Sequence, residues 1–246
     1  MTSTEAGRRF QVLADAQAVA TEAAEHLIAR IAESRIQPAI CLTGGSGPKA
    51  LYALLGSPDY RSRIAWDRVH WFIGDERFVS AGDPRNNMAM ARAIFLDRCA
   101  PPENIHPVPT DAPDPDTAAR LYERELQTFY GALRLDATKP LFDLVLMGLG
   151  PDGHTASLFP GDKALSETER WAVGVDHAHV EPFVPRVTLT LPALASSREM
   201  LFLVSGEAKR DILSKIMADA DLPGARAQSN GITTWLTDAA AAGRTA

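Results

Sequence analysis

Residues 148–154, which read GLGPDGH, put a histidine immediately after a glycine-rich turn. The turn follows the apolar run 142–147, so we expect His154 to lie at the end of a buried strand and to face a cleft. An imidazole there titrates near neutral pH and could act as a general base. We also expect His154 to stand at the start of a helix, whose positive end would disfavour the imidazolium and keep the ring available as a base. Asp152 could hydrogen-bond the ring or align a water molecule. From these residues alone, a histidine that merely caps a turn is an equal alternative.

The same loop satisfies G-x-G-x-x-G, a spacing typical of dinucleotide-binding turns. Asp176 even lies where such a site has its ribose-binding acid. The segment between them contradicts this interpretation, because Pro160 and Gly161 would end any helix that begins at His154 almost at once. Pro151 also occupies a turn position where a backbone N–H donor is needed. The sequence therefore disfavours a dinucleotide site.

Glycines also fill the loop 43–49, TGGSGPK, between a predicted strand and a predicted helix. Gly44 and Gly45 allow backbone N–H groups to approach a ligand closely, and Ser46 can donate its hydroxyl hydrogen. The helix that begins near Pro48 adds a positive dipole end. This combination favours a phosphate site, although an ordinary strand-to-helix turn would use the same glycines. The spacing of a nucleotide P-loop is absent.

Two further strand ends carry charged residues. In GDERFV, Arg77 could hold a phosphate with two hydrogen bonds, and Asp75 could accept hydrogen bonds from a sugar or orient a neighbour. In SGEAKRDIL, Lys209 falls in the first turn of a predicted helix, where a cation is unfavourable unless an anion is bound nearby. The alternatives are a salt-bridged surface turn in the first case and an exposed lysine in the second.

The elements that would position these residues alternate between short apolar runs and amphipathic helices. We predict strands at 39–43, 69–73, 142–147, 171–175, 187–191 and 200–205, and helices at 10–34, 49–55, 87–96, 116–133, 207–218 and 232–242. Such alternation is typical of a largely parallel sheet covered on both faces. Because no change in composition interrupts it, we expect one domain over residues 1–246, with the Pro/Asp-rich stretch 109–117 leading into a helix.

The composition limits the classes of partner. The net charge is −6, the isoelectric point is about 5.5, and Lys and Arg form no stripe, so neither nucleic acid nor an anionic membrane is an expected partner. The only cysteines, Cys41 and Cys99, exclude a disulfide scaffold and fit a reducing compartment. The N-terminus does not resemble a signal peptide, and no apolar window approaches the roughly 20 residues that span a bilayer. We therefore expect a cytoplasmic protein.

Two other catalytic classes are disfavoured. His177 and His179, beside Asp176, could place two imidazoles on one strand face, but no further metal ligand is evident, so we expect no metal. A serine hydrolase would carry a G-x-S-x-G nucleophile turn, which the sequence lacks.

Taken in order, TGGS, GDER, the helix start at Asn87 and GLGPDGHTASLFPG resemble the glucosamine-6-phosphate isomerase/6-phosphogluconolactonase family. The resemblance extends over essentially the whole chain. The deaminases of this family share G-x-G-x-D-G-H but continue with a Phe-Asn-Glu-Pro-type sequence. SLFPG stands here instead, which favours the 6-phosphogluconolactonase branch. Asn86 is a departure, since Ser or Thr would be expected before Asn87.

The resemblance implies a three-layer α/β/α sandwich with a mostly parallel, Rossmann-like sheet, as in the deaminase/ribose-5-phosphate isomerase-like superfamily. It implies no organic cofactor and no required metal. It is consistent with His154 as general base, Asp152 as its supporting neighbour and Asp75 as a third catalytic candidate. The residues that would bind the substrate and its phosphate are Gly44, Gly45, Ser46, Arg77, Asn87, Arg186 and Lys209.

The activity implied by the resemblance is hydrolysis of 6-phosphoglucono-1,5-lactone to 6-phosphogluconate in the oxidative pentose phosphate pathway. The expected partner is thus a small phosphosugar lactone, bound by a monomer or a weak homodimer. The alternatives are a sugar-phosphate deaminase or isomerase on the same fold, a dehydrogenase that binds a dinucleotide, and a non-catalytic module that binds a sugar phosphate.

Overall fold

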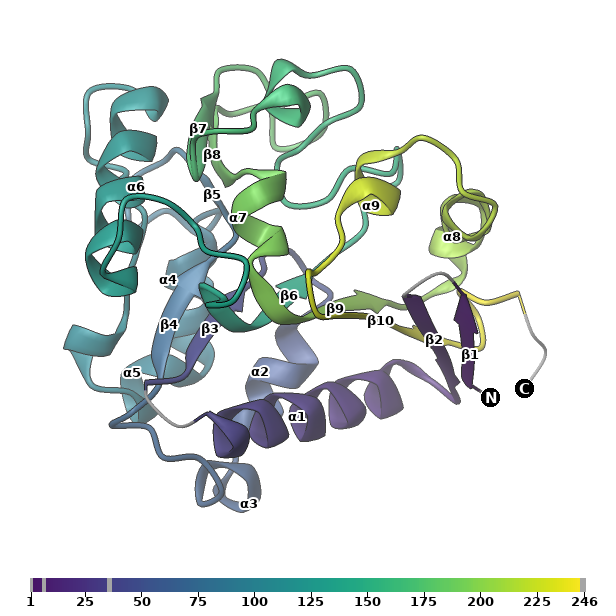
Figure 1. Ribbon diagram of the computed structural model, residues 1–246. Helices are drawn as coiled ribbons and strands as arrows, with labels where there is room; N and C mark the ends of the chain where they lie inside the picture. The colour runs from purple at the N-terminus through teal and green to yellow at the C-terminus, as the bar shows by residue number, and fades with distance from the viewer. Residues whose placement is uncertain (1, 6–7, 35–36, 244–246) are drawn as a thin grey trace.

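A computed structural model describes residues 2–5, 8–34 and 37–243, and a sheet in the order β1-β2-β10-β9-β6-β3-β4 runs through its middle (Figure 1). All neighbouring pairs from β2 to β4 are parallel, and only β1 runs antiparallel to its neighbour. The strands of this sheet are β1 (Thr2–Glu5), β2 (Arg8–Leu13), β3 (Ala39–Leu42), β4 (His70–Ile73), β6 (Phe142–Met147), β9 (Ser197–Val204) and β10 (Ile232–Asp238). Most of their side chains are buried, as expected for strands with both faces covered.

Helices cover both faces of this sheet. Helices α1 and α2 lie on one face, and α7 lies on the other (Figure 1). The helices are α1 (Ala16–Glu33), α2 (Lys49–Leu55), α3 (Pro58–Arg61), α4 (Asn87–Ala91), α5 (Asp97–Cys99), α6 (Pro115–Tyr130), α7 (Leu191–Ala195), α8 (Arg210–Met217) and α9 (Pro223–Arg226). The predicted three-layer α/β/α fold is therefore confirmed.

The prediction of a closing helix at 232–242 is wrong, because β10 occupies Ile232–Asp238 between β2 and β9. Trp235 stacks on Phe202 of β9, with 3.7 Å between ring centroids, and on Phe10 of β2 at 5.7 Å. The β-branched run before Trp235 favours a strand, and burial on both faces outweighs the helical tendency of the alanines that follow.

The prediction of one helix over 10–34 is wrong at its start. Arg8–Leu13 forms β2 and pairs with β10, and α1 begins only at Ala16. Asp15 caps that helix by accepting a hydrogen bond from the N–H of Ala18 at 2.8 Å. An aspartate that caps the helix thus marks a boundary that the hydrophobic spacing hides.

The predicted strands at 171–175 and 187–191 exist, but they belong to a second, antiparallel sheet. It runs in the order β5-β8-β7 and consists of β5 (Asp75–Arg77), β8 (Arg186–Leu189) and β7 (Ala172–Val175). Helix α6 packs against β7 and β8. In this register Arg77 lies opposite Arg186, and Asp75 lies opposite Thr188. The small sheet thus places an arginine from each of two distant segments side by side.

Several helix predictions differ in detail. The predicted helix 87–96 is α4 followed by a π-helical turn over Arg92–Leu96. The predicted helix 207–218 is a 3-10 turn over Glu207–Lys209 followed by α8. No helix begins at His154, because the chain continues there as turns with a short bridge between Thr155 and Leu158. A helix dipole therefore does not act on this histidine.

Candidate active site

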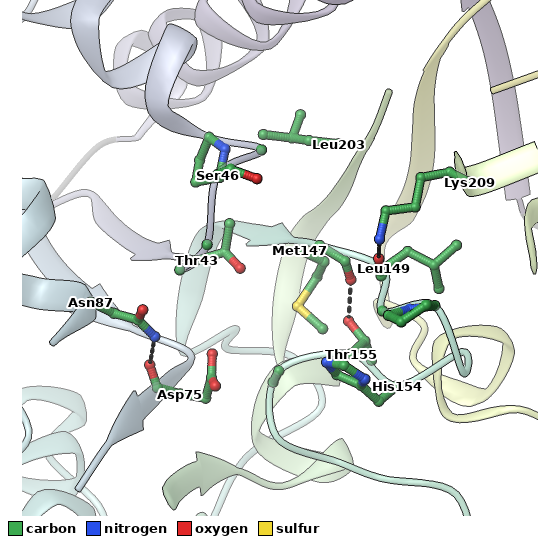
Figure 2. A pocket seen from close by; sticks show the side chains of 18 of the residues that line it. Thr43, Ser46, Asp75, Asn87, Met147, Leu149, His154, Thr155, Leu203 and Lys209 are labelled. Atoms are coloured by element: carbon green, nitrogen blue, oxygen red, sulfur yellow. Dashed lines mark hydrogen bonds between the residues drawn. The ribbon is translucent and has the colours of Figure 1, made fainter. Parts of the chain in front are cut away.

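A cleft of about 290 Å³ opens at the carboxyl ends of β3, β6 and β9, where ligands of open α/β sheets bind (Figure 2). It is lined by residues 43–48, 75, 77, 87, 147–151, 154–156, 203, 205 and 209. Eight of the ten predicted site residues are in this lining. Asp152 instead contacts the side of the His154 ring, and Arg186 lines an adjoining chamber that shares Asp75, Arg77 and His154 with the cleft.

His154 and Asp152 form a hydrogen-bonded pair. The Nδ1 atom of His154 lies 2.5 Å from Oδ1 of Asp152, which also accepts the backbone N–H of His154 at 3.1 Å. Burial alone would raise the pKa of Asp152, but these hydrogen bonds and the charge of His154 outweigh it and hold that pKa below its usual value. A carboxylate at Nδ1 fixes the tautomer, so the proton sits on Nδ1 and the lone pair on Nε2.

The loop that carries His154 is held at several points. The N–H of Gly150 donates to the carbonyl of His154 at 2.8 Å, and the Thr155 hydroxyl donates to the carbonyl of Gly148 at 2.8 Å (Figure 2). Gly153, at φ +87°, accepts a hydrogen bond from the N–H of Gly224 at the start of α9. These three hydrogen bonds fix the backbone that presents the imidazole.

Asp75 is buried at the junction of the two chambers. One of its carboxylate oxygens accepts the Ser157 hydroxyl at 2.6 Å, and its backbone carbonyl accepts the side-chain amide of Asn87 at 2.9 Å. Ser157 comes from the same loop as His154, so Asp75 ties the small sheet to the loop that carries the imidazole. The second oxygen, Oδ1, accepts no hydrogen bond from the described residues.

Arg77 brings positive charge to the cleft, and Arg186 brings it to the adjoining chamber. Arg77 donates to the carbonyl of Arg85 at 3.0 Å, and its buried Nε–H has no partner among the described residues. Arg186 donates to the carbonyls of Val184 and Pro182. The pKa of Arg186 is lowered to about 10, chiefly by burial and also by the charge of Arg77, against the opposing attraction of Asp75. The buried, unpartnered Nε–H of Arg77 and the desolvated guanidinium group of Arg186 favour an anion here.

The glycine loop lines the same cleft as Arg77. Tyr52 holds its first residue, since the hydroxyl donates to the carbonyl of Thr43 at 2.7 Å and accepts its N–H at 3.1 Å. A Cβ on Gly44 would lie 2.1 Å from Oδ1 of Asn87, so only glycine leaves room for that amide. Gly45 has φ +83° and open space around its Cα, as a backbone position that receives a ligand requires.

Lys209 reaches the cleft from the turn before α8. Its ammonium group donates to the carbonyl of Leu149 at 2.5 Å, one residue before the turn that leads to His154 (Figure 2). Burial lowers the pKa of Lys209, and Asp152 opposes this effect. The lysine therefore lies between the glycine loop and the histidine loop and is partly desolvated.

Among the described residues no group of three or more His, Cys, Asp or Glu side chains is arranged to hold a metal ion. His179 packs its ring edge-on to Phe159 at 5.7 Å, and Phe159 in turn contacts the His154 ring at 4.9 Å. Within the same residues, no helix is both long and apolar enough to span a membrane.

The sequence profile of a family described as glucosamine-6-phosphate isomerases/6-phosphogluconolactonase matches residues 14–235. The chain belongs to this family. A family member from Synechocystis, named 6-phosphogluconolactonase, is 42% identical over 217 residues, which cover 86% of each chain. A solved 6-phosphogluconolactonase from Trypanosoma cruzi superposes with a TM-score of 0.82 at 28% identity over 95% of both chains.

A solved structure with lower sequence identity to this chain also shares its fold. A monomeric glucosamine-6-phosphate deaminase superposes with a TM-score of 0.79 at 20% identity, over 95% of this chain and 98% of its own. The resemblance inferred from the motifs is thus confirmed, and so is the fold that it implies.

Several site residues escape the sequence analysis because their signal is tertiary. The hydroxyl of Tyr52 hydrogen-bonds both the N–H and the carbonyl of Thr43, just after β3. The hydroxyl of Tyr122 does the same for Ile73, the last residue of β4. Glu76 lies within the GDER motif, and only the structure shows that it is fully buried. Asn86, the departure from the family pattern, caps α4 by accepting the N–H of Ala89 at 2.8 Å, which Ser or Thr could also do.

Proposed function

We propose that this chain hydrolyses 6-phosphoglucono-1,5-lactone to 6-phosphogluconate. The observation that carries the proposal is the hydrogen-bonded pair of His154 and Asp152. This bond uses Nδ1 and leaves Nε2 of the ring available as a base, in a cleft that Arg77 and Lys209 also line. The family members compared above that are named 6-phosphogluconolactonase support the same activity. A strained ester is reactive already, so one positioned base and a bound phosphate suffice without a covalent intermediate.

In the proposed reaction, Nε2 of His154 takes a proton from a water molecule as the water oxygen bonds to the lactone carbonyl carbon. Backbone N–H groups of the glycine-rich turns stabilise the negative charge on the carbonyl oxygen. The tetrahedral intermediate then collapses, the bond from this carbon to the ring oxygen breaks, and the imidazolium returns its proton to the departing oxygen. Asp152 stabilises the imidazolium throughout.

The remaining predicted residues, apart from Asn87, bind the substrate in this proposal. The phosphate lies against Gly44, Gly45 and Ser46, with Lys209 and Arg77 supplying positive charge. Arg186 lines the adjoining chamber, and the free oxygen of Asp75 accepts a sugar hydroxyl. Asn87 is only 2% exposed, so its part is to brace the glycine loop against β5 rather than to make broad contact with substrate.

The test is a lactonase assay coupled to 6-phosphogluconate oxidation, with the spontaneous hydrolysis rate subtracted. General-base catalysis supplies about 10²–10⁴-fold, so His154→Ala should lower kcat by that factor. His179→Ala is the matched control, because it removes an imidazole that packs beside Phe159 without lining the cleft. Wild-type turnover in His154→Ala would overturn the assignment of the base.

A second assay separates the lactonase from the deaminase activity that the family description also names. The same protein is incubated with glucosamine 6-phosphate, and ammonia release is followed. We expect no release above background. Ammonia release without lactone turnover would replace the proposed function by the deaminase activity.

A further inference from the structure

Glu76 is the most deeply buried carboxyl group beside the cleft, and it binds only backbone. Its side chain lies on β5 with 0% exposure. Oε1 accepts the N–H of Arg77 at 2.8 Å and the N–H of Asn87 at 2.6 Å, and Oε2 accepts the N–H of Met88 at 2.9 Å. One carboxylate therefore joins β5 to the first turn of α4, two elements separated by a nine-residue loop (78–86).

These bonds hold the two residues that reach the cleft from this side. Arg77 presents its guanidinium group, with an unpartnered Nε–H, and Asn87 presents its amide to Gly44. Among the residues that the structure describes, no other side chain hydrogen-bonds either of these two, since Arg77 bonds the carbonyl of Arg85 and Asn87 bonds the carbonyl of Asp75. Their positions therefore depend on where their backbone is held, and Glu76 is the group common to both.

We propose that Glu76 is a positioning residue, whose carboxylate sets substrate affinity by fixing the backbone of Arg77 and Asn87. The inference rests on the proposed function, because affinity is measured as KM for the lactone. His154 and Asp152 lie on the other side of the cleft, on a loop that Glu76 does not contact. Loss of the carboxylate should therefore weaken binding while the chemical step is largely retained.

The surroundings of Glu76 make its ionisation depend on pH near neutrality. The pKa of Glu76 is raised to about 7, chiefly by burial. The three N–H donors oppose this rise, and Asp75 on the same strand contributes to it. Arg186 on β8 and Tyr122 on α6 also interact electrostatically with Glu76. Below pH 7 the group is mostly a neutral acid and binds the backbone N–H groups less strongly.

The experiment compares Glu76→Gln with Asn86→Ala. Glutamine keeps one oxygen for Arg77 and Asn87 but turns an NH2 group toward the N–H of Met88. Asn86→Ala removes the other cap of the same helix, whose bond ends on Ala89 and not on a residue of the cleft. Both variants loosen α4, but only Glu76→Gln should change substrate affinity.

We expect Glu76→Gln to raise KM roughly tenfold at pH 8 relative to Asn86→Ala, with kcat changed less than about threefold, since a bond to a charged group is being weakened. At pH 6 the wild-type carboxyl is itself mostly protonated, so the ratio of the two KM values should fall to about two. Ionisable groups other than Glu76, including the substrate phosphate, are common to both variants, so their effects cancel in this ratio.

Equal KM values in the two variants at pH 8, or a ratio that does not change with pH, would overturn the role of Glu76. If wild type hydrolyses no lactone, the proposed function fails instead, so the two failures are distinguishable. Glu76→Asp offers a second variant, because its carboxylate is charged but one methylene too short to reach α4, and it should also raise KM at pH 8.

A measurement on the wild-type protein needs no variant. The backbone amide proton resonances of Arg77, Asn87 and Met88 should titrate together near pH 7, and the affinity for 6-phosphogluconate should fall in parallel as the pH is lowered. Amide resonances that do not move between pH 6 and 8 would contradict the proposal even if no Glu76 variant folds.

Discussion

The imidazole of His154 occupies the space that a side chain on residue 150 would need. A Cβ built on Gly150 would lie 2.1 Å from both Nδ1 and Cε1 of that ring, inside any permitted contact distance. Gly150, the second glycine of the loop GLGPDGH, is therefore required by packing against the catalytic candidate rather than by a dinucleotide.

This contact predicts the effect of Gly150→Ala. The methyl group must displace the His154 ring, and a misplacement of about 1 Å costs roughly 10²-fold in rate. We expect kcat to fall by about that factor while the protein stays folded by circular dichroism. Gly82→Ala, where nothing lies within 4 Å of the new Cβ, should keep wild-type kcat. A fully active Gly150→Ala would show that the ring position is not critical.

Asp152→Asn tests the charge behind the imidazole. The amide oxygen can still accept the Nδ1–H bond, but it no longer stabilises the imidazolium by its charge. We expect kcat to fall roughly tenfold, and Asp152→Ala to reduce it further because the tautomer is then free. Steady-state kinetics across pH 6–9 measure both effects. Unchanged kcat in both variants would limit Asp152 to a structural role in the turn.

Arg77→Ala should act mainly on binding. If the guanidinium group holds the phosphate equally in the ground and transition states, KM should rise by about tenfold or more while kcat changes little. Arg85→Ala is a suitable control, because its backbone carbonyl still accepts from Arg77 while an exposed arginine is lost. A KM equal to that of wild type would remove Arg77 from the phosphate site.

Glu76 also predicts how stability depends on pH. Its pKa is raised from 4.5 to about 7 in the folded chain, so the folded state holds this proton more tightly than the unfolded state. The resulting stabilisation is complete below pH 4.5 and is lost as the pH rises through 7, by about 3 kcal/mol at 1.36 kcal/mol per pKa unit. Glu76→Gln lacks this dependence.

Urea unfolding of wild type and Glu76→Gln at pH 5 and pH 8 measures the difference. The free energy of unfolding of the variant, relative to wild type, should be higher at pH 8 than at pH 5, since other titrating groups are common to both. An identical difference at the two pH values would mean that Glu76 does not hold its proton near neutrality.

Trp235→Ala tests the strand assignment of 232–238. The side chain is fully buried between Phe10 and Phe202, so its loss should destabilise the chain by about 3–5 kcal/mol. For a chain of this size the melting temperature should fall by roughly 10 °C. Exposed Leu133→Ala is the control and should melt like wild type. An unchanged melting temperature in Trp235→Ala would contradict the buried strand.

The sequence by itself determined the class of fold and the strand ends that carry chemistry. Buried strands alternating with helices predict a parallel sheet with two covered faces, and GLGPDGH after FDLVLM predicts a histidine at its carboxyl edge. These features are local, because they depend on hydrophobic spacing and on glycine and proline within a few residues. The motifs also give the family, which the sequence comparison confirms.

Only the tertiary structure decided which segments become neighbours. ITTWLT is ambiguous alone and becomes a strand because β2 and β9 cover its edges and Phe202 stacks on Trp235. Arg186 reaches Arg77 through a small antiparallel sheet, and Glu76 joins β5 to α4 through backbone N–H groups. Such contacts join residues far apart in the chain, and their energy comes from burial, which no local pattern records.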